Sequence, residues 1–498
     1  MRRALAVLVA LSFCLAPLWL WGVPLRWHFL KLDDFVYLAR SRTAHALGRS
    51  WLTPYNAHVV PLFLLETHLL ARLAGTLEAV PAVLGWAGYT TLVLAMATAG
   101  HLVAWETGRP ARGLIAMAAV GLSSVLGPAV LWYAAGQALA SGTMILAMLA
   151  ALQAWRARGS WWLLGCGLLA AVAAPLFWSA GYTAGPAGSA YLWADGRRGC
   201  RRAAVLPLAA SLATAIVVGM VAGPAIAAAS PLGRAGWSLR DLDRLEPAMA
   251  HTAQAVCEAL VLNNLGLDAA TTPGQALVLV AILAGFWMQS RRRSDPPGPS
   301  RRPGLPFSPL EAAGAVLVLA NFAMIFAVRG TETTFDNLRT LGWYHAVPQL
   351  GAVLFAAGWW SGRPGPPPRA LEPPRLRDIL AATLFAAVLL LLQAPRADRV
   401  IFRYDGLSAP IPPVAGTTPG RVRTRADLAE RARSQRRALA ELDRLEQAAR
   451  QAGARIEALP AVADRPWVPG MPANLPDFRA SDLLDWPRTV VRAGGSDG

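Results

Sequence analysis

Two adjacent carboxylates, Asp33 and Asp34, are the side chains of this sequence best suited to acid–base chemistry. They stand in "LKLDDFVYLAR", directly after the first long apolar stretch, and Asn56 and His58 follow before the next one. A carboxylate can act as a general base by taking a proton from a hydroxyl group. Neighbouring side chains diverge by about 100° on a helix and oppose each other on a strand, so one site does not easily receive both acids. We therefore predict that one acid is a base and that the other holds Lys31, a nearby arginine or a helix N-terminus.

A plainer interpretation of the same residues stays open. The acids could cap a helix over "DDFVYLARS" at the membrane surface and take no part in chemistry. His58 could equally be a packing or surface residue. Trp19, Trp21 and Trp27 are typical of an interfacial belt rather than of a sugar-stacking platform.

The elements that must position these residues are membrane helices. Of the 498 residues, 55% are hydrophobic and 15% are charged, whereas a soluble domain carries roughly 25% charged residues. Apolar runs long enough to cross a hydrocarbon core of about 30 Å recur along the chain. We predict an all-α polytopic membrane protein with about eleven spans, near residues 4–25, 79–104, 114–135, 137–155, 160–175, 177–194, 203–223, 274–290, 308–328, 343–361 and 378–395.

The positive charge of the chain predicts how these spans are oriented. The net charge is +17, and Lys31 is the only lysine, so the cations are almost all arginine. Arginines cluster at 2–3, 109–112, 156–158, 197–202, 291–302 and 363–377. With the spans above, every cluster falls on one side, which is the cytoplasmic side by the positive-inside rule. We therefore expect a cytoplasmic N-terminus in an inner or plasma membrane, and we do not expect a nucleic-acid partner.

The other side of the membrane then holds four segments, namely 26–78, 224–273, 329–342 and everything from 396 on. Residues 236–262 have the leucine spacing of an amphipathic helix lying on a membrane surface. The domain boundary falls near 395, between a transmembrane domain (1–395) and an extracytoplasmic C-terminal region (396–498). That region contains a charged helix over about 424–459 and a disordered end. A short heptad seam in the helix allows packing on its own domain or a coiled-coil dimer.

Other kinds of chemistry have no motif in this sequence. The four cysteines, Cys14, Cys166, Cys200 and Cys257, do not form a disulfide framework. No Walker loop, dinucleotide fingerprint, CxxC pair or HExxH motif is present. Cytosolic nucleotide chemistry is therefore not supported.

The order of these features resembles the GT-C glycosyltransferases, which include the protein mannosyltransferases and the lipid A aminoarabinose transferases. The shared features are a first span, an outer loop that opens with Asp33-Asp34 and an aromatic residue, and an H–x–x–P element from His58 to Pro61. In layout the resemblance covers residues 1–395, but specific residues match only in 33–61 and more loosely in 329–348.

The resemblance implies a donor in which a sugar is linked to a polyprenyl phosphate, and an acceptor that is a lipid, a glycan or a protein. An outer-face carboxylate would act as base on the acceptor hydroxyl, which attacks the anomeric carbon with inversion. By analogy with the first acid of the family's motif, Asp33 is the expected base.

Further residues are expected to bind the substrates. Arg329, Arg339, Tyr344 and His345 are placed to hold the lipid phosphate, because a guanidinium group donates two hydrogen bonds to it at once. Asn56, His58 and Glu66 are also expected to bind substrate. No cofactor is certain. Some relatives use a divalent metal, which Asp33, His58 and Glu66 could ligate in principle, but no short ligand spacing supports such a site.

Three other functions stay open at this point. A polymerase or ligase of lipid-linked glycans would depend on outer-loop Arg and His residues rather than on the Asp pair. A transporter or flippase would move lipid-linked substrates, although functional acids of transporters tend to lie within the spans. A catalytically inactive scaffold would use the C-terminal region to recruit partners.

Overall fold

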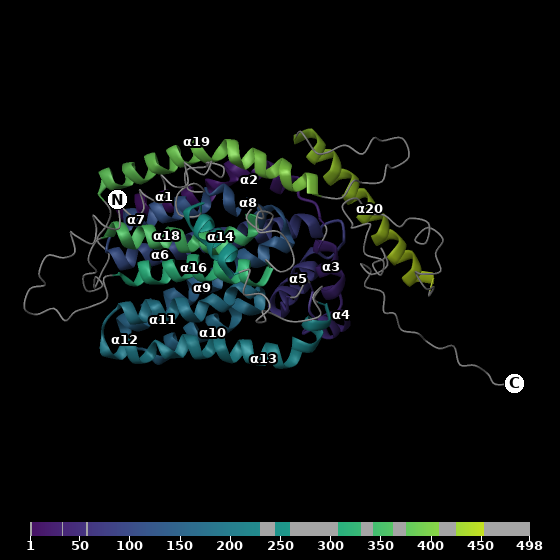
Figure 1. Ribbon diagram of the computed structural model, residues 1–498. Coiled ribbons are helices and arrows are strands. Elements are labelled where there is room, and N and C mark those ends of the chain that lie inside the picture. The colour runs from purple at the N-terminus through teal and green to yellow at the C-terminus, as the bar shows by residue number, and fades with distance from the viewer. Residues whose placement is uncertain are drawn as a thin grey trace, which may run out of the picture.

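The computed structural model describes residues 2–31, 33–55, 58–229, 245–258, 307–329, 342–361, 375–407 and 425–452. Throughout these ranges the regular structure is helical, and the only strand-like feature is one isolated bridge. Figure 1 shows long helices lying side by side in a bundle, with the N-terminus at one end. The predicted all-α class is confirmed for this part of the chain.

Helices occupy ten of the eleven predicted span ranges, and the eleventh, 274–290, lies outside the described residues. They are α1 (Arg2–Leu15), α2 (Pro17–Arg26), α6 (Val80–Thr107), α7 (Pro110–Gly121), α8 (Gly127–Leu131), α9 (Tyr133–Arg158), α10 (Trp161–Phe177), α11 (Ala184–Ala194), α12 (Arg198–Ala203), α13 (Val205–Ala229), α16 (Pro309–Arg329), α18 (Ala346–Ser361) and α19 (Leu376–Leu407). Of the described helices, five are long and apolar enough to cross a membrane, and seven are if each of two bent pairs is one span. The chain therefore has the helices of a membrane protein.

Several predicted spans are broken or have different ends. The first span bends by 40° between α1 and α2, where Pro17 lacks the N–H that would continue the helix. The expected span 114–135 is interrupted by the 3-10 helix η1 (Ser124–Leu126), and its two halves meet at 46°. The expected span 177–194 begins with a second 3-10 helix, η2 (Ser179–Thr183). α19 continues through Pro395 to Leu407, so this helix is longer than the span expected over 378–395.

Close packing between α16 and α18 depends on two glycines. A Cβ on Gly314 would lie 2.5 Å from the carbonyl oxygen of Gly351, and a Cβ on Gly351 would lie 2.9 Å from that of Gly314. Small residues at a crossing let two membrane helices approach closely. α16 itself starts with a capping box, because Glu311 accepts the backbone N–H of Ser308 at 2.5 Å and donates its own N–H to the Ser308 hydroxyl at 3.2 Å.

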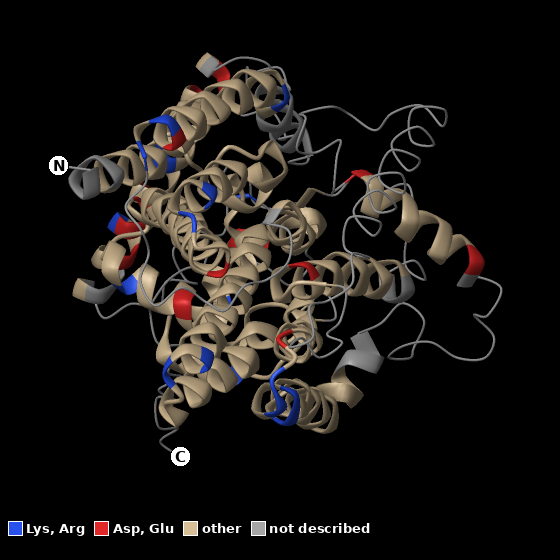
Figure 2. Ribbon diagram, turned by 90° about the vertical axis from the view of Figure 1, so that its left-hand side faces the viewer, with Lys and Arg blue, Asp and Glu red and all other residues tan. Residues whose placement is uncertain are grey.

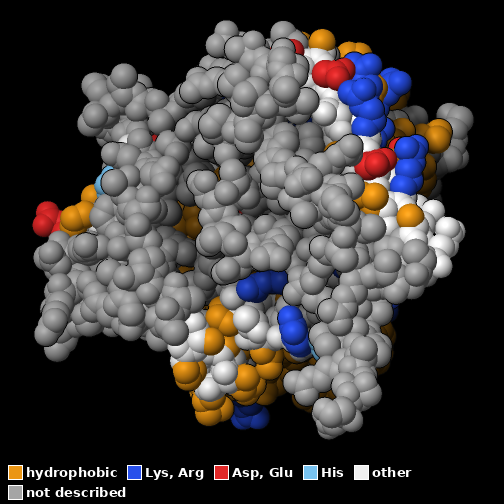
Figure 3. Space-filling model, turned by 90° about the vertical axis from the view of Figure 1, so that its right-hand side faces the viewer, with side chains coloured by type: hydrophobic (Ala, Val, Ile, Leu, Met, Phe, Trp, Pro, Cys, Tyr) orange, Lys and Arg blue, Asp and Glu red, His pale blue; other side chains and the backbone are white. Residues whose placement is uncertain are grey.

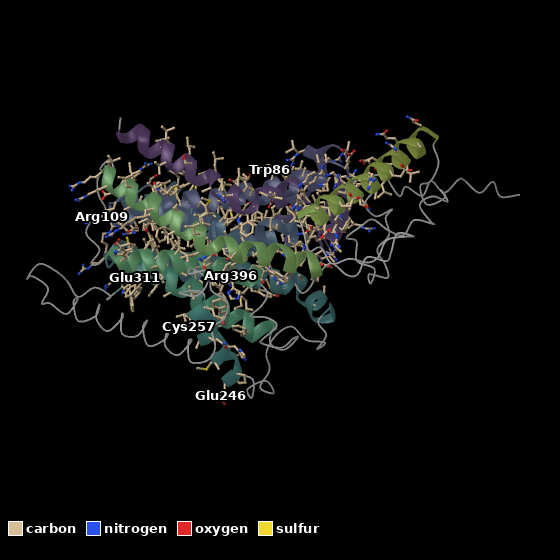
Figure 4. All side chains as sticks on the ribbon, turned by 90° about the horizontal axis from the view of Figure 1, so that it is seen from above. Trp86, Arg109, Glu246, Cys257, Glu311 and Arg396 are labelled. Carbon is tan, nitrogen blue, oxygen red and sulfur yellow. The ribbon has the colours of Figure 1, made fainter. Side chains whose placement is uncertain are left out.

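One end of the bundle carries arginines from several loops (Figure 2), and we call it the arginine-rich end. At its centre Arg156 forms ion pairs with Glu106 and Asp195, and Asp195 also pairs with Arg197 at 2.5 Å. Viewed from above, Arg109 and Glu311 lie at this same end, near the N-terminus (Figure 4). The network joins α6, α9 and the α11–α12 turn, so these arginines hold helix ends together.

The opposite end is built from α3 (Asp33–Ser41), α4 (Ala44–Ser50) and α5 (Pro61–Ala74), and we call it the α3–α5 end. The charged helix predicted at 424–459 is α20 (Arg425–Ala452), which packs here against its own chain; residues 453–459 lie outside the described range. Its buried Leu439 and Leu442 join a hydrophobic cluster with Leu30 and Phe35.

Polar groups fix the position of α20 on the α3–α5 end. The Gln435 side chain is fully buried, accepts the backbone N–H of Leu30 at 2.7 Å and donates to the Leu30 carbonyl at 2.9 Å. Farther along, Asp443 accepts the backbone N–H groups of Leu77 and Glu78 at 3.0 and 3.2 Å, just before α6 begins. A carboxylate at a helix N-terminus is favoured by the helix dipole.

The amphipathic segment expected over 236–262 is described only as α14 (Leu245–Cys257) and the residue after it. Its Ala248 and Ala255 are buried in the main core of the bundle, and His251 lies 6.0 Å from the ring of Phe326 on α16. One face of α14 therefore packs on protein, instead of resting on the membrane surface alone as predicted.

Replacing Gln435 tests the docking of α20. Gln435→Ala would leave the N–H and the C=O of Leu30 buried without partners, which costs about 1–3 kcal/mol for each group. We expect a lower thermal unfolding midpoint in detergent and faster proteolysis at the ends of α20. Gln447→Ala, at an exposed position of the same helix, is the matched control. Equal midpoints for the two variants would contradict this docking.

Candidate functional site

The two carboxylates at the start of α3 lie in different environments. Asp34 is fully buried, whereas Asp33 is partly exposed. This divergence follows from the turn of the helix, which directs successive side chains to different faces. The two acids therefore have different chemical possibilities.

Asp34 holds the α3–α5 end to the bundle. One carboxylate oxygen accepts the backbone N–H of Lys31 at 2.8 Å, and the other accepts that of Ala134 at 2.7 Å, in the first turn of α9. No side chain of α9's own N-cap residue makes such a bond. Burial raises the pKa of Asp34 to about 7, opposed by the two backbone hydrogen bonds and by the Lys31 charge. Two N–H donors fit an ionised carboxylate, because a protonated oxygen would direct its O–H at a donor.

Lys31 strengthens the same connection. Its ammonium group donates to the carbonyl of Leu131 at 3.2 Å, at the end of α8, and lies 4.8 Å from the centre of the Phe29 ring. The single lysine of the chain is thus buried beside the carboxylate pair. Nearby, burial and the Lys31 charge lower the pKa of His28 to about 3, so that imidazole is neutral at physiological pH.

Asp33 accepts a hydrogen bond from the hydroxyl of Tyr55 at 2.7 Å. Burial raises the pKa of Asp33, and the Tyr55 hydrogen bond opposes that rise. Tyr55 is itself fixed by Tyr37, whose ring meets it edge-on at 5.4 Å, and by the Arg40 guanidinium 5.0 Å from its centre. A carboxylate with a raised pKa, a fixed orientation and some exposure is suited to accept a proton.

His58 is joined to Tyr55 by the isolated bridge. The two residues exchange backbone hydrogen bonds of 2.9 Å in both directions. The His58 Nδ1 atom lies 3.0 Å from the Ser179 hydroxyl of η2, and its ring lies 6.1 Å from that of Trp178. The bridged residues Tyr55 and His58 therefore connect Asp33 to the turn between α10 and α11.

Aromatic rings continue from His58 to the start of α18. Tyr344, in the 3-10 helix η5 (Gly342–His345), stacks on Trp178 with ring centres 5.6 Å apart. Trp343 meets Trp132 edge-on at 4.9 Å, directly before α9. Segments far apart in the sequence thus form one aromatic wall, made of Trp132, Trp178, Trp343 and Tyr344. Trp178 and Tyr344 are buried, whereas Trp132 and Trp343 are partly exposed. Partly exposed rings can stack on a sugar or line the path of an apolar chain.

The remaining predicted residues are placed less directly. Glu66 lies on α5, where burial raises its pKa to about 7. His345 is buried against Phe322 with ring centres 5.1 Å apart. Arg329 is the last residue of α16, and its side chain is not among those described; Asn56 and Arg339 lie outside the described residues.

A divalent metal does not fit the acids and histidines described. Within the ranges given above, no three of the His, Cys, Asp and Glu side chains come close enough to share an ion. Asp33, His58 and Glu66 therefore do not form the metal-ligand set that the sequence allowed in principle.

The sequence interpretation did not include Tyr55, Trp178 and Ser179. Tyr55 stands beside the predicted Asn56, so its closeness to the site could have been inferred. Trp178 and Ser179 precede the Gly/Pro-rich turn "AGYTAGPAG" at the expected outer side. Asn321 on α16 anchors this turn by donating to the Thr183 hydroxyl at 2.8 Å.

Comparison with known proteins adds no assignment. The chain matches no protein-family model, no curated protein and no solved structure. The class that fold and composition define is a helical membrane protein with a carboxylate-containing site at the α3–α5 end.

Amide substitutions should separate the roles of the two acids. Asp34→Asn would place an NH₂ group opposite one of two backbone N–H donors, so we expect a loss of about 1–3 kcal/mol in stability. Asp33→Asn retains an acceptor for Tyr55 and should change stability little. Thermal unfolding of both purified variants in the same detergent measures the difference. A larger loss for Asp33→Asn would contradict the structural role of Asp34.

Proposed function

We propose that this protein is a membrane glycosyltransferase that moves a sugar from a polyprenyl-phosphate donor to an acceptor hydroxyl at the extracytoplasmic face. The observation that carries the proposal is that two adjacent acids have different environments and different partners. Asp34 is used for structure, and Asp33 is left partly exposed, oriented by Tyr55 and with a raised pKa. If both acids only capped α3, Asp33 would not need to be partly exposed and oriented by Tyr55.

The reaction proceeds by one displacement. The Asp33 carboxylate takes the proton of the acceptor hydroxyl while the acceptor oxygen bonds to the anomeric carbon of the sugar. The bond from that carbon to the phosphate oxygen breaks, and its electron pair leaves with the polyprenyl phosphate. Attack from the face opposite the leaving group inverts the anomeric configuration.

The residues around Asp33 provide binding surfaces for this reaction. His58 and the aromatic wall contact the sugar or the acceptor, with Glu66 on the neighbouring α5. Arg329, Arg339, Tyr344 and His345 are proposed for the lipid phosphate on the basis of sequence. Of these, Tyr344 and His345 lie in η5, directly before α18.

The orientation belongs to the same proposal: about eleven spans, a cytoplasmic arginine-rich end, and an extracytoplasmic α3–α5 end with the C-terminal region. The support is that Arg156 and Arg197, from two of the predicted cytoplasmic clusters, meet at one end of the bundle. Short arginine-rich loops stay in the cytoplasm during insertion.

Two exposed glycines on helices allow the orientation to be measured. Gly48 on α4 and Gly199 on α12 have no atom within 4 Å of an added Cβ. In a background without the four native cysteines, Gly48→Cys should react with a membrane-impermeant maleimide on intact cells. Gly199→Cys should react only after permeabilisation. The reverse pattern would invert the orientation and place the site in the cytoplasm.

Sugar transfer tests the mechanism itself. Asp33→Asn keeps size and hydrogen bonding but removes basicity, so turnover should fall by about 10²–10⁴, with little change in the KM for donor. The assay follows transfer from a polyprenyl-phosphate sugar by purified protein in lipid. Asp378→Asn, at the far end of α19, is the matched control. Wild-type turnover in Asp33→Asn would refute Asp33 as the base.

The acid limb of the pH profile gives an independent test. The base must be ionised, so kcat/KM falls as pH drops through the pKa of Asp33. Tyr55→Phe removes the hydrogen bond that favours the carboxylate, and the pKa of Asp33 should rise. We expect the acid limb to move to higher pH. An acid limb at the same pH as in the unmodified protein would show that Tyr55 does not influence the group that titrates.

The same assays distinguish the other functions. A glycan polymerase or ligase would keep its activity in Asp33→Asn and lose it on replacement of His345 or Arg329. A transporter or flippase would move labelled lipid across a vesicle bilayer without forming a new glycosidic bond.

A further inference from the structure

Arginines from two distant parts of the chain gather around one indole ring at the end of α2. The guanidinium carbons of Arg26, Arg433 and Arg436 lie 5.3, 5.9 and 5.7 Å from the centre of the Trp27 ring. Arg26 ends α2, while the other two are on α20. Cation–π attraction favours each contact separately, but the three like charges repel one another.

One carboxylate of α20 meets this cluster. Arg433 and Arg437 both pair with Glu430, each at 3.2 Å. The Nε–H of Arg436 is buried without a hydrogen-bond partner. Arg436 also donates to the backbone carbonyl of Arg26 at 3.0 Å, which holds the two helices together. A buried donor among like charges is suited to bind an anion.

An apolar stripe leads along the first span to the same place. Leu8, Leu11, Leu15 and Trp19 are exposed by 61%, 57%, 62% and 81%. Leu8, Leu11 and Leu15 lie on one face of α1, because they are three or four residues apart. Trp19 follows on α2 beyond the bend, and Arg26 comes two turns later. The bent pair α1–α2 is long and apolar enough to cross a membrane as one span.

The stripe and the cluster together have the form of a lipid. We propose that Arg26, Arg433 and Arg436 bind the phosphate of an anionic membrane lipid, whose acyl chains lie along the stripe on α1 and α2. Guanidinium groups hold phosphate oxygens with paired, charge-assisted hydrogen bonds. Tryptophans are enriched at membrane–water interfaces, so the proposal places Trp27 at the depth of the lipid head group. Basic and acidic side chains share the described surface of this end with apolar ones, as Figure 3 shows.

The bound lipid has a mechanical role. Its phosphate bridges α2 and α20, and it adds to attachments of α20 such as Gln435 to Leu30 and Asp443 to the residues just before α6. The lipid therefore helps to keep α20 on the α3–α5 end. This inference does not rest on sugar transfer, so loss of the proposed enzymatic activity would leave it standing.

The test is a lipid titration of the purified full chain in a neutral detergent, followed by native mass spectrometry. Phosphatidylglycerol should bind more tightly than phosphatidylcholine with the same acyl chains. The variant with Arg26→Gln, Arg433→Gln and Arg436→Gln should weaken phosphatidylglycerol binding by at least about tenfold, because each hydrogen bond to a charged group contributes strongly. Arg433→Gln alone, at an exposed position, should cause a smaller loss without affecting folding.

Arg444→Gln is the matched control, since Arg444 is an exposed arginine of α20 that pairs with Glu441 at 3.5 Å. It should bind phosphatidylglycerol like the unmodified chain. Equal affinity for the two lipids, or equal weakening by Arg444→Gln and by the triple variant, would overturn the proposal. Inorganic phosphate at constant ionic strength is the last arm. Protection of the thermal midpoint by phosphate to the same extent as by lipid would show that the site binds free phosphate.

Discussion

The α3–α5 end depends on one buried carboxylate. Asp34 accepts backbone N–H groups from Lys31 and from Ala134, which are 3 and 100 residues away in the sequence. Without it, the first turn of α9 would have an unmatched donor inside the protein, and the segment after α2 would lose one of its attachments to the bundle. The partly exposed position of Asp33 is a consequence, because the orientation of α3 is set by its neighbour.

The segment around residue 30 is held from two sides. Asp34 and Lys31 attach it to α8 and α9, and Gln435 pairs with both backbone groups of Leu30 from α20. Tyr55 and His58 then connect this segment to the aromatic wall. Precise placement of a reactive group requires such support, because small displacements of a catalytic group cost much of its rate.

Much of the helical layout could be predicted from the sequence, since long apolar runs leave the backbone no other way to satisfy its hydrogen bonds in a membrane. The charged helix near 425 and the separate environments of Asp33 and Asp34 were also accessible, because they follow from local spacing. Contacts between residues far apart in the sequence could not be predicted. Nothing near Asp34 in the sequence identifies Ala134, and nothing near His58 identifies Ser179. The bends at Pro17 and before Gly127 depend on packing as well as on residue type.

The bonds between Gln435 and Leu30 also have a consequence for biosynthesis. They join residues 405 positions apart, across nearly the whole chain. The ribosome adds roughly 5–20 residues per second, so Leu30 leaves it well before its partner exists. The backbone groups of Leu30 therefore have no Gln435 partner until α20, the last described helix, has been synthesised. Until then they form hydrogen bonds with water or with other proteins. A chain that ends before residue 425 would therefore contain the apolar helices but have an incomplete α3–α5 end.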